Sequence, residues 1–228
     1  IHCGTESRLF LSYPCIWQSK TGRAFLLHPF SGTPRSLFLK SVLSSRQESG
    51  MRNSNLFLLH MTLETARLQL REMRLSDMKS LSSILQDERV MYAYNGAFNE
   101  EKTMMWMRKQ LRRYKEFGFG LWAVLLRDTK EMIGQCGITM QEYRMTRVPE
   151  IGYLLAHDYW HKGYATEAAI ACREYGLDTL KFDALYSTVR DTNLTSRKVA
   201  LRNGMHPVDT IVRHYRGVEM PHIVFCTK

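Results

Sequence analysis

One short stretch of the chain holds both a potential base and a potential anion-binding turn. Glu150 is the one carboxylate in the apolar run 149–155, which predicts a strand. Gly163 lies in the turn that follows, and the small residues after it predict a helix. Free N–H groups at the start of a helix, after a permissive glycine, bind anions and suit a phosphate. The strand carboxylate could take a proton from whatever reacts beside that phosphate.

Other chemical motifs in the chain are weaker. The run 118–123 has the letters of a dinucleotide fingerprint, but it follows a predicted helix and precedes a predicted strand, which is the wrong order. His157 and His161 are four residues apart without an evident third ligand, so the sequence predicts no metal site. The sequence contains neither a G-x-S-x-G elbow nor a Walker-type phosphate loop.

Composition indicates a soluble globular protein. The chain has 228 residues, of which 44% are hydrophobic and 24% charged, and no apolar run is long enough to span a membrane. Five cysteines lack paired or metal-like spacing, which favours reduced thiols in a cytoplasmic protein. Half of the net charge of +10 lies in residues 1–60, so we expect no nucleic-acid partner from the charge alone.

Residues 1–60 do not resemble the rest of the chain. They show no sustained period, and their Arg- and Ser-rich, acid-poor composition superficially suits an organelle transit peptide. We expect instead a non-native or disordered extension, with Met61, or less favourably Met51, as the natural start. Residues 61–228 would then form one catalytic domain, beginning with the alternating pattern 62–71.

From residue 61 onward, periodicity and cap residues predict eleven elements in the order β-α-α-β-β-β-α-β-α-β-β. The predicted strands are 67–73, 121–127, 132–143, 149–155, 183–190, 209–215 and 220–226, and the predicted helices are 76–85, 99–117, 163–179 and 193–203. Residues 87–98 are expected to form a loop. This order fits an α/β (α+β) fold with a mixed sheet and helices on both faces. The basic side chains of 99–117 are expected to be solvated surface.

The loop 160–165, Glu150 and the segments 193–199 and 203–205 together resemble the GNAT superfamily of acetyl-CoA-dependent N-acetyltransferases. The family's loop reads Q/R-x-x-G-x-G/A, and Gly163 and Ala165 match it, whereas Trp160 stands at the Q/R place. The branch that includes the ribosomal-protein N-terminal (alanine) acetyltransferases often has tryptophan there. The resemblance is therefore closest to that branch, and it extends over residues 62 to about 227. It implies a largely antiparallel sheet of six to seven strands with a splayed central pair.

The resemblance also implies where acetyl-CoA binds. Backbone groups of Tyr153 and Leu155 would pair with the pantetheine arm, while Asn193 and Ser196 would face the pantetheine and the thiol. The pyrophosphate would bind the N–H groups of the loop, and the expected loop contacts are Trp160, His161, Lys162, Gly163, Tyr164, Ala165 and Thr166. No metal is implied.

Glu150 is the candidate general base, because an alkylammonium must lose a proton before its nitrogen can attack a thioester. The alternative is a structural salt bridge with Arg147 or Arg71. A backbone N–H near Tyr153 or Leu154 could hold the developing oxyanion.

The general acid is less evident. Leu201 stands where many members of the family have a tyrosine. Ser196 is the favoured substitute, Tyr215 is a weaker one, and a thiolate can also leave unaided.

The acceptor is left open by the sequence. A protein N-terminus, a polyamine, an aminoglycoside or another small amine would all fit. Tyr92, Tyr94, Asn95, Arg144 and Tyr215 could line its site or could equally serve packing. A homodimer also remains open. The rival interpretation is a binding module of the same fold, which holds an acyl-CoA, or binds RNA through the basic side chains of 99–117.

Overall fold

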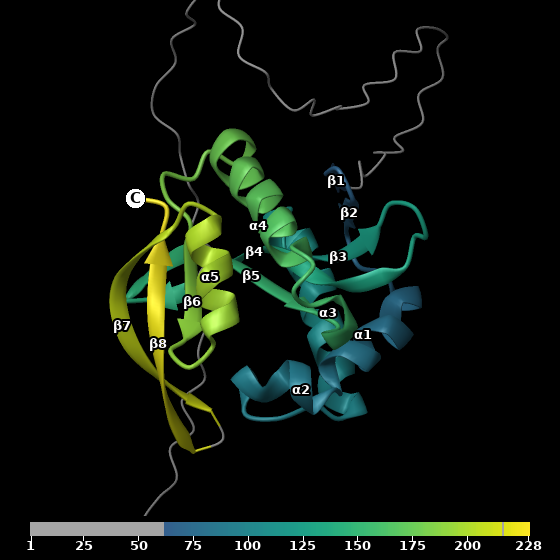
Figure 1. The fold of residues 1–228 in the computed structure, drawn as a ribbon, viewed down its shortest axis with the longest axis horizontal. Coiled ribbons are helices and arrows are strands. Elements are labelled where there is room, and N and C mark those ends of the chain that lie inside the picture. The colour runs from purple at the N-terminus through teal and green to yellow at the C-terminus, as the bar shows by residue number, and fades with distance from the viewer. Residues whose placement is uncertain (1–61, 216) are drawn as a thin grey trace, which may run out of the picture. The chain divides into compact units, whose positions relative to one another are not determined.

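The computed structural model describes residues 62–228, apart from residue 216 and the side chain of Tyr215. The predicted extension 1–60 lies outside these described residues. Eight strands form one sheet in the order β1-β2-β3-β4-β5-β6-β8-β7 (Figure 1). All neighbouring strands are antiparallel except β5 and β6, which are parallel. The predicted fold class is therefore confirmed.

The elements follow the predicted order. The strands are β1 (Thr62–Glu64), β2 (Leu68–Arg71), β3 (Leu121–Leu126), β4 (Met132–Tyr143), β5 (Thr146–Leu155), β6 (Tyr186–Arg190), β7 (His206–Tyr215) and β8 (Val218–Cys226). The helices are α1 (Met78–Leu85), α2 (Glu88–Met91), α3 (Glu100–Phe117), α4 (Tyr164–Glu174) and α5 (Leu194–Arg202). A π-helical turn, Tyr175–Thr179, extends α4.

The sheet has an apolar core on each face, because side chains of a strand alternate between the faces. On one face, Trp122 and Val124 of β3 pack in a cluster with Ala168 and Ala169 of α4 and with side chains of α5. On the other face, Leu121 and its alternate neighbours on β3 pack with α1, α2 and α3. Small residues on α4 let that helix approach the sheet closely, and this fixes the loop before it.

Helix ends agree with the local signals in the sequence. The side chain of Asn99 accepts a hydrogen bond from the Lys102 N–H at the start of α3, and Gly118 ends that helix with a φ of +76°. Asn193 accepts from the Ser196 N–H at the start of α5. The bonds of Asn99 and Asn193 are N-cap interactions, which satisfy N–H groups that the helix itself leaves unpaired.

Three predicted segments differ from the structure. The start of the domain is a hairpin of β1 and β2, so the sheet has eight strands instead of six to seven. The predicted loop 87–98 contains the short helix α2, which is capped by the side chain of Asp87. The strand expected at 183–190 begins only at Tyr186. These errors concern short elements, whose periodicity is too brief to read.

The strands β5 and β6 separate soon after they meet. They pair at one position, Glu150 with Tyr186, whereas β4 and β5 pair over the whole length of β5. Two side-chain bonds also join the strands: the Ser187 hydroxyl donates to the Ile151 carbonyl over 2.7 Å, and the Thr188 hydroxyl donates to the Glu150 carboxylate over 2.6 Å. The predicted splay of the central pair is thus present in the sheet.

Among the described residues, no helix is long and apolar enough to cross a membrane. Cys136, Cys172 and Cys226 are buried free thiols. The sulfurs of Cys136 on β4 and Cys172 on α4 lie 3.6 Å apart, as packing partners between the helix and the sheet.

Candidate active site

The backbone of β5 is open on the side that faces β6. The Ala156 N–H bonds to Ile133 on the β4 side, whereas the Ile151 carbonyl points toward β6. Because backbone groups alternate along a strand, the N–H and C=O groups of Tyr153 and Leu155 also point toward β6. No β6 residue pairs with them. The Leu154 N–H points the other way, so Tyr153 is the better placed of the two candidate oxyanion donors.

A cavity of about 340 Å³ lies against this open backbone, and we call it the loop cavity. Every residue that the sequence predicts as a cofactor contact lines this cavity, with the exception of Lys162. The predicted residues in its lining are Tyr153, Leu155, Trp160, His161, Gly163, Tyr164, Ala165, Thr166, Asn193 and Ser196. Trp160 also fixes the end of β5, since its indole N–H donates to the Leu155 carbonyl over 2.9 Å.

The start of α4 is built to leave its N–H groups available. Gly163 is the N-cap residue, with a φ of +83°, and no side chain caps the helix. His161 has a φ of +59°, which is unusual for a residue with a side chain. The two left-handed residues turn the chain tightly into the helix. An anion at this end would satisfy N–H groups of the first turn and interact favourably with the helix dipole.

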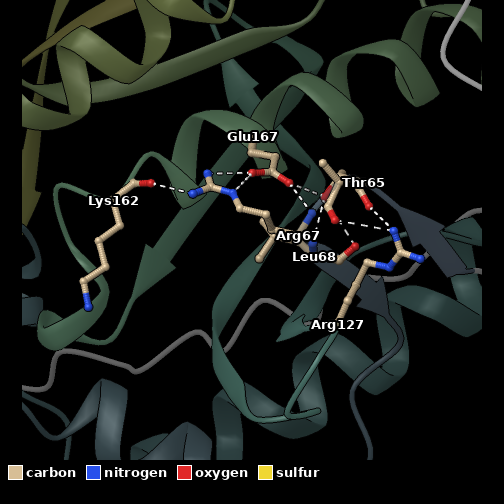
Figure 2. Close-up of polar contacts among 7 residues, drawn as sticks. Thr65, Arg67, Leu68, Arg127, Lys162 and Glu167 are labelled. Carbon is tan, nitrogen blue, oxygen red and sulfur yellow. Dashed lines mark hydrogen bonds and ion pairs between the residues drawn. The ribbon is translucent and has the colours of Figure 1, made fainter.

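Hydrogen bonds from the turn between β1 and β2 hold the loop before α4 in place (Figure 2), and we call this network the brace. Glu167, in the first turn of α4, accepts from the Thr65 hydroxyl over 2.6 Å and from the Arg67 Nε over 2.7 Å. Arg67 also donates to the Lys162 carbonyl over 3.0 Å. Burial opposes ionisation of Glu167, but the bonds from Thr65 and Arg67 outweigh it and lower its pKa. Lys162 thus contributes its carbonyl to the brace, although its side chain does not line the cavity.

We expect Arg67→Ala to weaken acetyl-CoA binding about three- to tenfold, because the loop loses its link to Glu167 and to the Lys162 carbonyl. Calorimetric titration with acetyl-CoA measures this. Arg127→Ala is the matched control: the Arg127 side chain is also 47% exposed and bonds to Thr65 of the same hairpin, but it does not touch the loop. Equal affinities of the two variants would show that the brace has no part in binding.

Glu150 lies where β5 and β6 meet, and its side chain is 17% exposed. The Thr188 hydroxyl donates to Oε2 over 2.6 Å, and an Arg213 nitrogen lies 3.6 Å from the same oxygen. Burial raises the pKa of Glu150, although Thr188 and the nearby arginines oppose the shift. The two salt-bridge partners considered from the sequence are wrong. Arg71 pairs with Asp77, and the ion pair of Glu150 within residues 62–228 is with Arg213 instead of Arg147.

A second cavity, of about 460 Å³, surrounds this carboxylate, and we call it the Glu150 cavity. The residues that it shares with the loop cavity are Ala93, Tyr153, Leu154, Asn193 and Ser196, so the two cavities adjoin beside Ser196. A molecule in the loop cavity could therefore present a group to a second molecule held near Glu150.

Ser196 and Tyr153 form a hydroxyl pair at the junction of the cavities. The Ser196 hydroxyl donates to the Tyr153 oxygen over 3.0 Å, and Tyr153 donates to the Ser196 carbonyl over 2.9 Å. Burial raises the pKa of Tyr153 well above its ordinary value, so its hydroxyl stays protonated at neutral pH. Leu201 is 53% exposed and lines neither cavity. The side chain of Tyr215 lies outside the described residues.

The other sequence candidates divide between the cavities. Tyr92 lines the loop cavity and Tyr94 the Glu150 cavity. Asn95 lines neither of them, nor does Arg144, which pairs with Asp209 at 2.8 Å.

Sequence analysis missed two cations of the loop cavity, Lys198 and Arg202 of α5. They are four residues apart and so share a helix face, which was a readable signal. It also missed Arg67, whose partner Glu167 is 100 residues away in the chain.

Comparisons with known proteins agree with this geometry. A family model described as an acetyltransferase (GNAT) domain matches residues 67–206. The YkkB protein of Bacillus subtilis is 37% identical over 150 residues, which are 65% of this chain and 87% of that protein. YnaD of the same organism, an N-acetyltransferase by name, is 32% identical over 146 residues, which are 64% of this chain and 82% of that protein.

Solved structures of similar fold include an acetyltransferase from Agrobacterium tumefaciens, with a TM-score of 0.63 and 28% identity over 77% of this chain and 98% of that one. Ribosomal-protein-S5-alanine acetyltransferase from Vibrio fischeri has a TM-score of 0.59 and 16% identity over 73% and 95% of the two chains. RimJ of Mycobacterium smegmatis, solved with CoA-disulfide, has a TM-score of 0.58 and 21% identity over 70% and 80%. At such low identity, the last two share the fold alone.

Proposed function

This chain belongs to the GNAT acetyltransferase family, and we propose that it transfers the acetyl group of acetyl-CoA to a primary amine. The observation that carries the proposal is the pair of adjoining cavities. One offers open strand backbone and an uncapped helix start, and the other holds a buried carboxylate. The first suits a phosphate-bearing thioester and the second an amine.

The residues of the loop cavity fit acetyl-CoA in three ways. The Tyr153 C=O and the Leu155 N–H can pair with the amides of the pantetheine arm, as a neighbouring strand would, while the Leu155 C=O already accepts from Trp160. The N–H groups after Gly163 can bind the pyrophosphate. Lys198 and Arg202 add positive charge to the lining. The thioester carbon would then lie at the junction of the cavities, beside the Tyr153 N–H.

Glu150 would act as the general base on the amine. An alkylammonium has a pKa near 10, so it must give up a proton before its nitrogen can attack. The carboxylate takes that proton directly or through a water, and the neutral nitrogen attacks the thioester carbon. The Tyr153 N–H holds the negative oxygen that develops. The C–S bond then breaks and leaves an amide and a thiolate, and the second proton lost by the nitrogen replaces the one that Ser196 gives to the sulfur.

Ser196 would return a proton to the thiolate. Its hydroxyl lies at the junction of the cavities, and Tyr153 stands behind it as a second protonated hydroxyl. Asn193 holds the Ser196 backbone N–H, so the serine can change without loss of the helix cap. The reaction depends less on this general acid than on the general base, because a thiolate leaves fairly well unaided.

We expect Ser196→Ala to lower kcat about three- to tenfold, with little change in the KM for acetyl-CoA. Ser196→Thr keeps a hydroxyl and should restore most of the rate. Steady-state release of free thiol measures both variants. If the threonine variant is as slow as the alanine variant, the loss comes from packing and not from the proton donor.

The test of the function itself is thiol release from acetyl-CoA with a panel of amines, and mass spectrometry of the products. The panel includes peptides that begin with Ala or Ser, because relatives in fold act on ribosomal proteins. The expected result is an acetylated amine and one equivalent of free thiol. Acetyl-CoA binding without acetylation of any amine would support a binding module instead of an enzyme.

A further inference from the structure

The Glu150 cavity is lined by five basic side chains and one carboxylate. Three of the basic residues come from one face of α3, and the others come from β6 and β7. They are Lys102, Lys109, Arg113, Arg190 and Arg213, and Glu150 is the carboxylate. Burial lowers the pKa of His222, a further lining residue, which therefore adds no positive charge at neutral pH. The cavity thus carries an excess of positive charge.

This charge has little compensation from the protein. Within residues 62–228, Arg213 is the one member of the five with a carboxylate within 4 Å, namely Glu150. Arg113 donates to the amide oxygen of Gln110 over 3.0 Å, and Arg190 donates to the Tyr92 carbonyl over 2.8 Å. Both of those acceptors are neutral. Burial lowers the pKa of Arg113, which reflects the cost of holding this charge in the cavity.

Arg213 in particular has unused donor capacity. Its side chain is 29% exposed, its contact with Glu150 is 3.6 Å long, and its Nε is buried without a hydrogen-bond partner in the described part of the chain. A guanidinium prefers short paired bonds to a carboxylate or a phosphate. Its position beside the candidate base places it next to the site of the amine.

We infer that the acceptor is a primary amine that also carries a carboxylate or phosphate close to the amine; this rests on the function proposed above. Glu150 receives the ammonium group, while Arg213 and Arg113 bind the anionic group. The excess positive charge attracts such an acceptor and repels polycations, so polyamines and aminoglycosides are poor acceptors. The phosphates of acetyl-CoA do not need these residues, because the loop cavity has its own cations and helix start.

The experiment compares matched pairs of amines with the wild-type protein by kcat/KM. The pairs are O-phosphoethanolamine with ethanolamine, β-alanine with β-alaninamide, and a Ser-Asp peptide with a Ser-Asn peptide; spermidine is the polycation. We expect the anionic member of a reacting pair to be preferred about tenfold or more, since a charge-assisted hydrogen bond contributes that much. Preference within the peptide pair indicates a protein N-terminus, and preference within the other two pairs indicates a small molecule.

Two variants and a control locate the preference in the cavity. Arg113→Gln and Arg213→Gln should each remove most of the preference and leave acetyl-CoA affinity unchanged. Arg112→Gln removes the same charge from the adjacent position of α3, which does not line the cavity, and should keep the preference. An equal loss of this preference in all three variants would show that the overall positive charge of the protein, and not a specific site, selects the acceptor.

The remaining outcomes separate this inference from the proposed function. Preference for ethanolamine, the amides or spermidine overturns the anionic acceptor and leaves the acetyltransferase in place. Acetyl-CoA binding without acetylation of any anionic amine also overturns it. Failure of acetyl-CoA to bind overturns the proposed acetyltransferase function, on which this inference rests.

Discussion

Replacing Glu150 with glutamine is expected to lower the catalytic rate about a hundredfold or more, within the usual range for loss of a general base. Glutamine has the same shape, and its amide oxygen can still accept the bond from Thr188, so the fold should persist. Acetyl-CoA affinity should barely change, because the expected contacts to the cofactor lie in the loop cavity. Single-turnover rates with saturating acetyl-CoA measure the chemical step directly.

The pH profile gives an independent check on Glu150. A base works only when deprotonated, so the rate should rise with pH through the pKa of Glu150. Burial raises that pKa, so this acidic limb should lie at higher pH than for an exposed glutamate. The limb should flatten in Glu150→Gln. Glu142→Gln is the control, since Glu142 is exposed on the adjacent strand β4 and should keep the normal rate and profile.

Near-normal turnover of Glu150→Gln with an unchanged acidic limb would assign Glu150 to a structural role between β5 and β6. The base would then be another group, or the amine would arrive neutral.

Gly163→Val is expected to weaken acetyl-CoA binding about tenfold or more while the protein stays folded. Gly163 has a φ of +83°, a conformation that a β-branched side chain adopts only with strain. Relief of that strain would distort the start of α4, whereas the added side chain itself would only touch the Arg67 guanidinium, whose nitrogen lies 3.4 Å from the position of a Cβ. The N–H groups of the first turn would then no longer converge on the pyrophosphate.

Gly118→Val separates the loss of affinity from general backbone strain. Gly118 also has a left-handed φ, of +76°, but it ends α3 and lines neither cavity. Both variants should lower the melting temperature, and only Gly163→Val should lower affinity in a calorimetric titration. Unchanged affinity of a folded Gly163→Val protein would remove the phosphate from this loop.

The features that sequence predicted well are those with local signals. Asn99, Gly118 and Asn193 mark helix ends through interactions with residues three or four positions away, and the structure confirms all three. The continuous apolar run 121–126 predicted the strand β3. The loop 160–166 was recognisable because strand, glycine and helix are consecutive in the chain.

The features that sequence could not give depend on strand order. Arg213 reaches Glu150 because β7 and β8 fold back beside β6, an arrangement that no short pattern encodes. Arg67 binds Glu167 from a hairpin that lies 100 residues earlier in the chain. The helix α3 illustrates a third limit: its basic residues were predicted to be solvated, but Lys109 and Arg113 line a cavity that other elements complete.

The sheet also has a line of weakness between β5 and β6. One backbone pair and the hydroxyls of Ser187 and Thr188 connect the strands there, so the backbone ladder couples the two halves of the sheet only weakly. Acetyl-CoA in that gap would join the halves as a strand does. A ligand that binds only the folded form stabilises it by about 2.7 kcal/mol at a hundredfold excess over its Kd. The supply of the cosubstrate would thereby govern how long each molecule of the enzyme survives, as well as how fast it works.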